Sequence, residues 1–142
     1  MLQRFVRYSV VFAMFLLFSA SIAADERSAI EPDGFEPDGP ANLVSLTVDG
    51  EPQRCSLHDA SDNDWFVFSV EQGNTYEIVV TPEDTAANLS IGVYGFGWTT
   101  FSFTGTGGEP LVMEDVAYES YRPRVFGDGY TGYYTIQIRS VQ

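Results

Sequence analysis

Apolar and polar residues alternate with a period of two over most of the chain beyond residue 42. The clearest instance is the segment 64–70. Phe66, Phe68 and Val70 would share one face of a strand there, with Trp65, Val67 and Ser69 on the other. Successive side chains of a β-strand point to opposite faces of its sheet, so this spacing predicts a strand. Because both faces are largely apolar, we expect this strand to be central in its sheet and covered on one side.

The same alternation predicts a series of further short strands separated by turns. They are expected at 43–48, 53–58, 75–81, 88–94, near 101–103, 111–116, 121–126 and 133–139. Asp49-Gly50 is a typical hairpin sequence. Pro123 predicts an edge strand or a bulge, since proline donates no backbone hydrogen bond. Eight or nine short strands and no useful helical period predict an all-β fold, an antiparallel β-sandwich or jelly roll.

Residues 1–23 have the pattern of a signal peptide. Arg4 and Arg7 precede an apolar run over 10–18, and the small residues Ser21 and Ala23 occupy the positions that a signal peptidase reads. An uncleaved anchor is the alternative, but the apolar run is short for a spanning helix. We therefore expect cleavage after Ala23 and an exported protein, periplasmic or secreted, with no stable membrane insertion after cleavage.

An acidic lead-in, residues 24–41, precedes the predicted sandwich, residues 42–142. It contains two copies of Glu-Pro-Asp-Gly, at 31–34 and 36–39. Proline favours extended geometry in the residue before it, and glycine permits a turn. Two interpretations stay open for this lead-in. Either it is a flexible acidic linker, or one copy of the repeat folds back and places its carboxylate oxygens on an ion.

Charge narrows the range of partners. The formal net charge is −13 at pH 7, with twenty acidic residues and no lysine, and loss of the two signal-peptide arginines brings it to about −15. Such a charge argues against nucleic acid and anionic membrane surfaces as partners. It is compatible with cation binding, with a basic partner, or with solubility in salty surroundings.

Catalysis is not expected. Cys55 is the only cysteine and cannot form an internal disulfide, so a buried and inert thiol is the expected outcome. His58, the only histidine, would point to the opposite face of the same strand, which disfavours a Cys–His dyad. The chain has no Gly-x-Ser-x-Gly nucleophile elbow and no lysine.

Five motifs in order are similar to those of a known family. Residues 35–38 read Phe-Glu-Pro-Asp, 62–68 read Asp-Asn-Asp-Trp-Phe-Val-Phe, and the others lie at 72–78, 89–94 and 132–136. Together they resemble the bacterial pre-peptidase C-terminal domain, a β-sandwich module related in fold to the collagen-binding domains of bacterial collagenases. The resemblance covers roughly 35–138. It implies a fold rather than a target, because function resides in sites grafted on folds.

The resemblance also implies a metal site. In the collagenase relatives, the acidic N-terminal segment and the loop near the Asp-x-Asp signature hold calcium. Carried over by position, this implies Glu36, Asp38, Asp62 and Asp64 as calcium ligands. Calcium takes six to eight oxygen ligands, so four carboxylates completed by backbone and water are reasonable chemistry. The alternative is a solvated aspartate-rich turn.

The leading functional hypothesis is an exported, non-catalytic binding module for a protein or polysaccharide ligand. The aromatic residues that fall near predicted loops or edges are Phe96, Trp98, Tyr118, Tyr121 and Tyr130. There they could stack on sugar or pack on an extended protein, unless they fill the core instead. The rival hypothesis is a structural, assembly or export-assisting envelope protein that acts on a partner hydrolase through an edge strand.

Overall fold

A computed structural model describes residues 30–36, 39–95, 103–127 and 129–142. Over these ranges the chain forms nine strands and no helix, which confirms the all-β prediction. They are β1 (Val44–Ser45), β2 (Gln53–Leu57), β3 (Asn63–Ser69), β4 (Thr75–Pro82), β5 (Leu89–Tyr94), β6 (Phe103–Thr106), β7 (Leu111–Met113), β8 (Ser120–Gly127) and β9 (Gly132–Val141). The described part of the chain therefore holds no helix that could span a membrane. The predicted signal peptide lies outside it.

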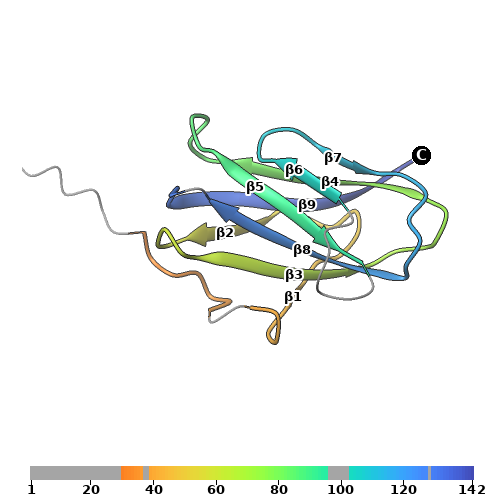
Figure 1. The fold of residues 1–142 in the computed structure, drawn as a ribbon, viewed down its shortest axis with the longest axis horizontal. Coiled ribbons are helices and arrows are strands. Elements are labelled where there is room, and N and C mark those ends of the chain that lie inside the picture. Colours follow the sequence, from red (N-terminus) through yellow and green to blue (C-terminus); the bar gives the residue numbers. More distant parts are fainter. Residues whose placement is uncertain (1–29, 37–38, 96–102, 128) are drawn as a thin grey trace, which may run out of the picture.

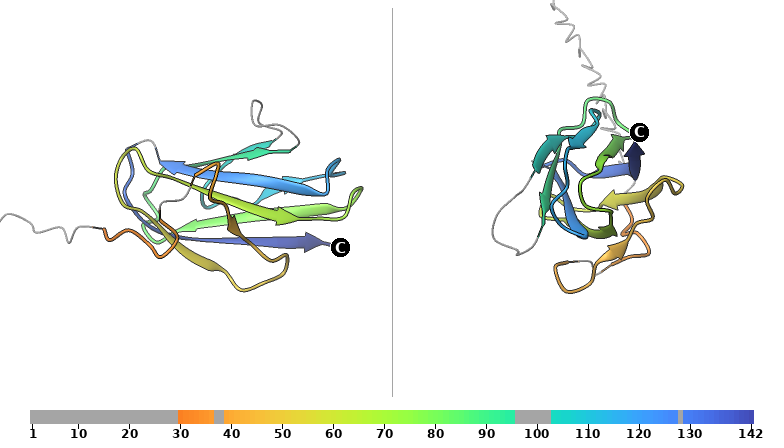
Figure 2. Two further views of the ribbon diagram at one scale, coloured as in Figure 1. Left: turned by 90° about the horizontal axis from the view of Figure 1, so that it is seen from below. Right: turned by 90° about the vertical axis from the view of Figure 1, so that its right-hand side faces the viewer.

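Two sheets pack face to face as a β-sandwich (Figures 1 and 2). One sheet has the order β1-β3-β8-β5-β6 and the other β2-β9-β4-β7. All pairs are antiparallel except β1 with β3, which are parallel. The longest ladder joins β4 to β9 and runs from Thr75↔Val141 to Pro82↔Tyr134.

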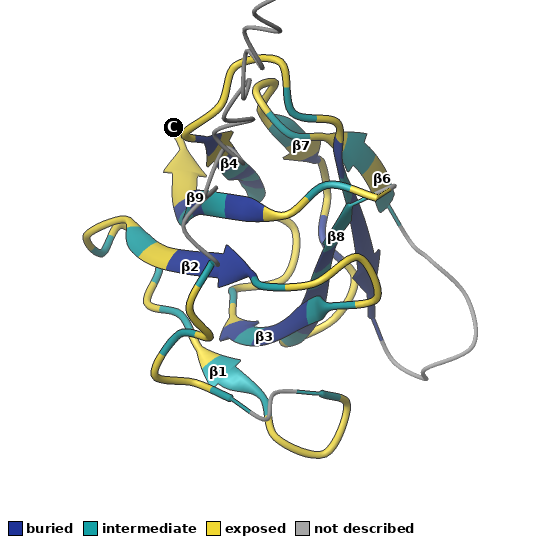
Figure 3. Cartoon of the chain, turned by 90° about the vertical axis from the view of Figure 1, so that its left-hand side faces the viewer, coloured by how far each residue is buried: buried dark blue, intermediate teal, exposed yellow. Residues whose placement is uncertain are grey.

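The core lies between the sheets, and the predicted period of two identifies most of it. The alternate residues of β3, β4, β5 and β9 are buried (Figure 3). They include Phe66, Phe68, Tyr76, Ile78, Val80, Leu89, Ile91, Val93, Tyr134, Ile136 and Ile138. On the outer face of β3, Trp65 stacks on Tyr94 with ring centroids 5.3 Å apart, so both faces of this strand are covered.

Of the two alternatives predicted from Pro123, an edge strand or a bulge, the edge strand is wrong. Pro123 belongs to β8, which is flanked by β3 on one side and β5 on the other. Pro123 is paired with Val93 of β5, whereas the pairing of β8 with β3 is interrupted between Trp65↔Arg124 and Phe68↔Tyr121. Because proline has no N–H to donate, the ladder breaks locally on the β3 side while the strand remains internal.

Asp49-Gly50 forms a turn but not a hairpin. Asp49 has the positive φ of 57° expected of a turn residue. The strands on either side of it, β1 and β2, belong to different sheets, so they do not pair with each other. The turn instead carries the chain from one layer of the sandwich to the other.

Two ends of the sandwich matter for function. At one end β2 finishes, β3 begins and the described part of the lead-in approaches (left in Figure 1). At the other end β3 leads into the turn before β4, near the segment that precedes β8 (right in Figure 1). The seven residues of β3 separate the two ends by about 20 Å.

Candidate functional site

The lead-in docks onto the edge of β2. Ser56, which is fully buried, donates its backbone N–H to Asp33 Oδ2 over 2.9 Å and its hydroxyl to the Glu31 carbonyl over 2.9 Å. Asp33 Oδ1 also accepts the N–H of Phe35, which closes the turn. An edge strand leaves backbone donors without a partner strand, and here the first Glu-Pro-Asp-Gly copy supplies the acceptor. The first copy is therefore part of the folded domain.

A cluster of three possible metal ligands, Glu36, His58 and Asp62, follows directly from this docking. Glu36 comes from the lead-in, His58 follows β2, and Asp62 precedes β3. His58 Nδ1 lies 2.7 Å from Asp62 Oδ2 and 3.0 Å from Glu36 Oε1. Asp62 is 7% exposed, Glu36 21% and His58 28%, so the cluster sits just below the surface.

The Nδ1 nitrogen of His58, when protonated, forms an ion pair with both carboxylates. His58 Nδ1 and Glu36 Oε1 are buried atoms that have no hydrogen-bond partner. Asp62 Oδ2 instead accepts the backbone N–H of His58 over 2.9 Å. Burial acts to lower the pKa of His58, but the charges of Asp62, Glu36 and Asp59 outweigh it and raise the pKa. The arrangement thus concentrates negative charge around one imidazole.

Asp64 lies in a neighbouring cluster rather than with Asp62. It is on the inward face of β3, 1% exposed, and accepts a hydrogen bond from the Tyr134 hydroxyl of β9. Asp33 and Cys55 have ligand atoms close to the Asp64 carboxylate. Asp62 precedes the strand, in a turn where its N–H bonds to the Asp59 carbonyl over 3.2 Å. The two carboxylates therefore diverge although only one residue separates them.

The expected calcium ligands are only partly brought together. Glu36 and Asp62 meet, Asp64 belongs to the adjacent cluster, and Asp38 lies outside the described residues. His58 completes the first cluster, which the strand period does not predict because it places His58 only relative to Cys55. The spacing of four residues between His58 and Asp62 across a turn was the available signal. Calcium prefers oxygen ligands alone, so a donor set with an imidazole nitrogen fits it poorly.

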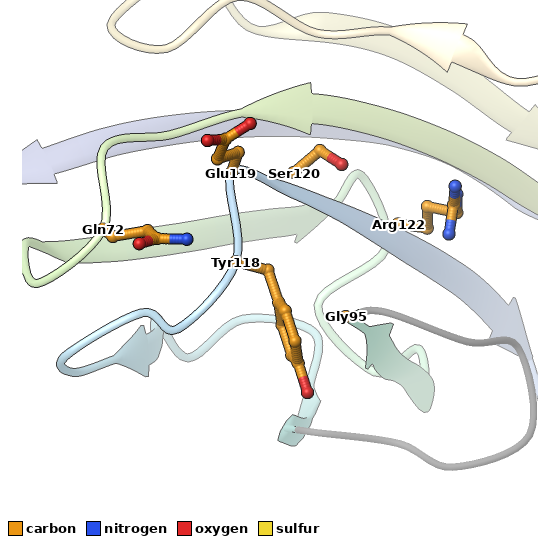
Figure 4. A pocket seen from close by; sticks show the side chains of 6 residues that line it. All are labelled: Gln72, Gly95, Tyr118, Glu119, Ser120 and Arg122. Atoms are coloured by element: carbon orange, nitrogen blue, oxygen red, sulfur yellow. The ribbon is translucent and has the colours of Figure 1, made fainter.

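The opposite end of the sandwich carries a hollow of about 280 Å³ (Figure 4). Its lining comes from the turn after β3, the end of β5 and the start of β8: Gln72, Gly95, Tyr118, Glu119, Ser120 and Arg122. Figure 4 shows Tyr118 extending from the segment before β8 and Arg122 projecting from β8 itself. A second hollow shares Gln72 and Glu119 and continues along the end of β3.

The aromatic ligand candidates differ in exposure. Tyr118 is 39% exposed, and its ring packs against that of Tyr121 with centroids 5.7 Å apart. Tyr121 is 1% exposed and lies in the core, so the expectation that it contacts a ligand is corrected. It is buried because it lies on the inward face of β8, where Phe68 stacks on it. Tyr130 is half-buried beside the core. Phe96 and Trp98 lie outside the described residues.

The fold, though not a sequence family, is matched among known proteins. The sequence matches no family model and no curated protein. The structure is similar to the pre-peptidase C-terminal domain of a Bacillus anthracis collagenase, with a TM-score of 0.58 and 15% identity over 72% of this chain and 96% of that one. It is also similar to PliG of Aeromonas hydrophila, a periplasmic inhibitor of g-type lysozyme, with a TM-score of 0.54 and 14% identity over 70% and 97% of the two chains. The resemblance to the pre-peptidase C-terminal domain is therefore confirmed at the level of the fold.

Proposed function

We propose that this chain is an exported, non-catalytic module that binds a basic protein, and that Tyr118 and Arg122 form the centre of its binding face. The observation that carries the proposal is Tyr118. A large aromatic side chain that is 39% exposed stands at the rim of a hollow, next to an arginine. Tyrosine and arginine are enriched among the residues that dominate protein–protein binding energy.

Tyr118 is also held in place before any partner arrives. Its ring packs on the buried ring of Tyr121, and the Tyr121 hydroxyl accepts the N–H of Ala117 over 3.0 Å. Phe103 and Phe68 pack on the other sides of Tyr121. A side chain that is already ordered loses little conformational entropy on binding, so it contributes more of its contact energy to affinity.

The class of partner follows from charge and from the similar folds. A net charge of −13 favours encounter with a basic protein and disfavours an acidic one. One protein of similar fold is a periplasmic lysozyme inhibitor, and the other is a domain of a collagenase. Both similarities support a module that accompanies or restrains a hydrolase outside the cytoplasm. A g-type lysozyme is the first partner to test.

The two other hypotheses have weaker support. A polysaccharide platform needs several exposed coplanar rings, and among the described residues the large exposed aromatic side chains are Tyr118 and Phe35, one at each end of the sandwich. Recruitment through an edge strand needs a long free edge. The edge strands of the two described sheets have two (β1), five (β2), four (β6) and three (β7) residues, and the lead-in bonds to β2.

The test is binding of the purified protein to g-type lysozyme, measured by isothermal titration calorimetry together with residual lytic activity. Wild-type protein should form a 1:1 complex and reduce lysis. Tyr118→Ala and Arg122→Ala should each weaken binding at least tenfold, whereas Val112→Ala, another exposed apolar residue but on β7, should not. If both variants bind as tightly as the wild type, this face is not the binding site. If the wild type forms no complex, g-type lysozyme is not the partner.

A further inference from the structure

We propose that Glu36, His58 and Asp62 form a binding site for a divalent transition metal such as Zn²⁺, and that this site fastens the lead-in to the sandwich. The three donors come from three separate segments of the chain. An ion bound by all of them would join the lead-in to the turn between β2 and β3. This site and the proposed protein-binding face lie at opposite ends of β3, so one can fail without the other.

The three donor atoms lie almost as far apart as the ligands of a zinc ion. Tetrahedral zinc with ligands at about 2.0–2.2 Å places its donor atoms about 3.4 Å apart. Here Nδ1 of His58 lies 2.7 Å from Asp62 Oδ2 and 3.0 Å from Glu36 Oε1. A shift of a few tenths of an ångström at each side chain would accommodate the ion. The partial exposure of Glu36 and His58 leaves a fourth position open to water.

Within the described structure, two of the three donor atoms have only each other and Asp62 as charged neighbours, at 2.7–3.0 Å. Glu36 Oε1 and His58 Nδ1 are buried and make no hydrogen bond. Leaving a buried polar atom unsatisfied costs about 1–3 kcal/mol, and more when the group is charged. A metal ion would satisfy both atoms at once and would neutralise the repulsion between the Glu36 and Asp62 carboxylates.

The other nitrogen of His58 has the environment typical of a metal-ligating histidine. Its Nε2 lies 3.6 Å from Asp59 Oδ2. The Asp59 carboxylate is fixed in turn, because its Oδ1 accepts both the N–H and the hydroxyl of Ser61 over 2.7 Å. With a metal bound at Nδ1 the proton would be on Nε2, and the Asp59 carboxylate would face it and help to orient the ring.

Donor chemistry selects the class of metal. One imidazole nitrogen with two carboxylates suits Zn²⁺ and similar transition metals. Calcium, implied by the sequence resemblance, takes six to eight oxygens and gains nothing from the imidazole. The further carboxylate expected for calcium in the described region, Asp64, is turned inward towards Tyr134.

The test uses His58 as a unique reporter, since the chain has one histidine. Metal-free protein, produced without a histidine tag, is titrated with Zn²⁺ or Ca²⁺ while the ring ¹⁵N resonances are followed by long-range ¹H–¹⁵N NMR. We expect Zn²⁺ to shift the Nδ1 resonance with 1:1 stoichiometry and Ca²⁺ to leave it in place. This readout uses wild-type protein and needs no variant to fold.

The second measurement is the Zn²⁺ affinity of variants, determined by isothermal titration calorimetry. His58→Ala and Glu36→Gln should weaken Zn²⁺ binding by more than the ~10–100-fold that loss of a supporting group costs, whereas Glu109→Gln, an exposed glutamate on the loop before β7, should bind as wild type. Two results would overturn the proposal. One is an unchanged Nδ1 resonance at saturating Zn²⁺, which would mean that the cluster is an imidazole–carboxylate ion pair and not a metal site. The other is Ca²⁺ binding that is tighter than Zn²⁺ binding and survives His58→Ala.

Discussion

Asp33 and Ser56 are joined by a 2.9 Å hydrogen bond, from the Ser56 N–H to Asp33 Oδ2, across 23 residues of sequence. The contact closes the exposed edge of β2 with the first acidic repeat of the lead-in. It converts a segment with the composition of a linker into part of the domain. The cluster of Glu36, His58 and Asp62 at that end of the sandwich depends on the docking.

Asp33→Ala should destabilise the protein by about 1–3 kcal/mol, because the buried Ser56 N–H loses its acceptor. Urea unfolding measures the loss, and amide hydrogen exchange should show faster exchange at Ser56. Asp84→Ala is the matched control, since Asp84 Oδ1 accepts the N–H of Ala86 two residues later in the same manner as Asp33 Oδ1 accepts that of Phe35. Equal destabilisation by both substitutions would mean that only the local turn matters.

Tyr118→Ala and Tyr121→Ala should have opposite consequences. Tyr121 is buried among Phe68 and Phe103, so its truncation should cost about 3–5 kcal/mol, as for other buried aromatics. Tyr118 is partly exposed, so its loss should change stability by less than about 1 kcal/mol while removing partner binding. Thermal unfolding and calorimetry on both variants separate the two roles. A large stability loss from Tyr118→Ala would make it a structural residue instead.

Acid should weaken the contact between Asp49 and β9. Asp49 accepts the Ser140 hydroxyl over 2.6 Å and the Ser140 N–H over 2.9 Å, and these bonds lower the pKa of Asp49. A carboxylate whose pKa is lower in the folded state stabilises the fold above its ordinary pKa of 3.8, and this stabilisation is lost as the pH falls through the lowered value.

Asp49→Asn tests this pH dependence, since asparagine tolerates the positive φ of 57° and does not titrate. Unfolding midpoints measured from pH 6 to pH 2 should fall less steeply for Asp49→Asn than for the wild type. Asp115→Asn, at the other aspartate with positive φ, should keep the wild-type slope. Parallel slopes for Asp49→Asn and the wild type would show that Asp49 does not contribute.

The position of the Tyr130 ring requires that residue 132 has no side chain. A Cβ added at Gly132 would overlap the Tyr130 hydroxyl, so Gly132→Ala should destabilise by about 1–3 kcal/mol. The substitution should cost much less in a Tyr130→Ala background, and urea unfolding of the single and double variants gives this coupling. Gly34→Ala, where the added Cβ meets nothing within 4 Å, is the control. An additive double variant would contradict the overlap.

The sequence identified the strands well because alternation is a local property that burial enforces. Phe66 and Phe68 are inward, as the period of two requires. The sequence does not show which strands pair with each other. Asp49-Gly50 marks a turn correctly, but which sheet each flanking strand joins depends on distant residues. Pro123 lies inside a sheet because a ladder can lose one hydrogen bond locally while the rest of β8 remains paired.

The candidate site could be predicted only in part, because it depends on contacts between residues that are distant in the sequence. Glu36 and Asp62 could be named from motif order, whereas the divergence of Asp64 from Asp62 depends on where β3 begins and on Tyr134 across the sandwich. His58 joins the cluster through a turn, where the strand period used to assess it no longer applies. Composition gives the charge, but it does not indicate which carboxylates the fold brings together.

The proposed metal ion at Glu36, His58 and Asp62 would join the lead-in and the sandwich into one unit. The most direct test is thermal unfolding of the purified protein in excess Zn²⁺, in excess Ca²⁺ and in chelator. An ion that binds only the folded state adds about 2.7 kcal/mol at a hundredfold excess over Kd. We predict that Zn²⁺ raises the Tm by roughly 10 °C in the wild type and leaves it unchanged in His58→Ala. A rise with Ca²⁺ alone, or the same Tm in all three conditions, would contradict the proposal.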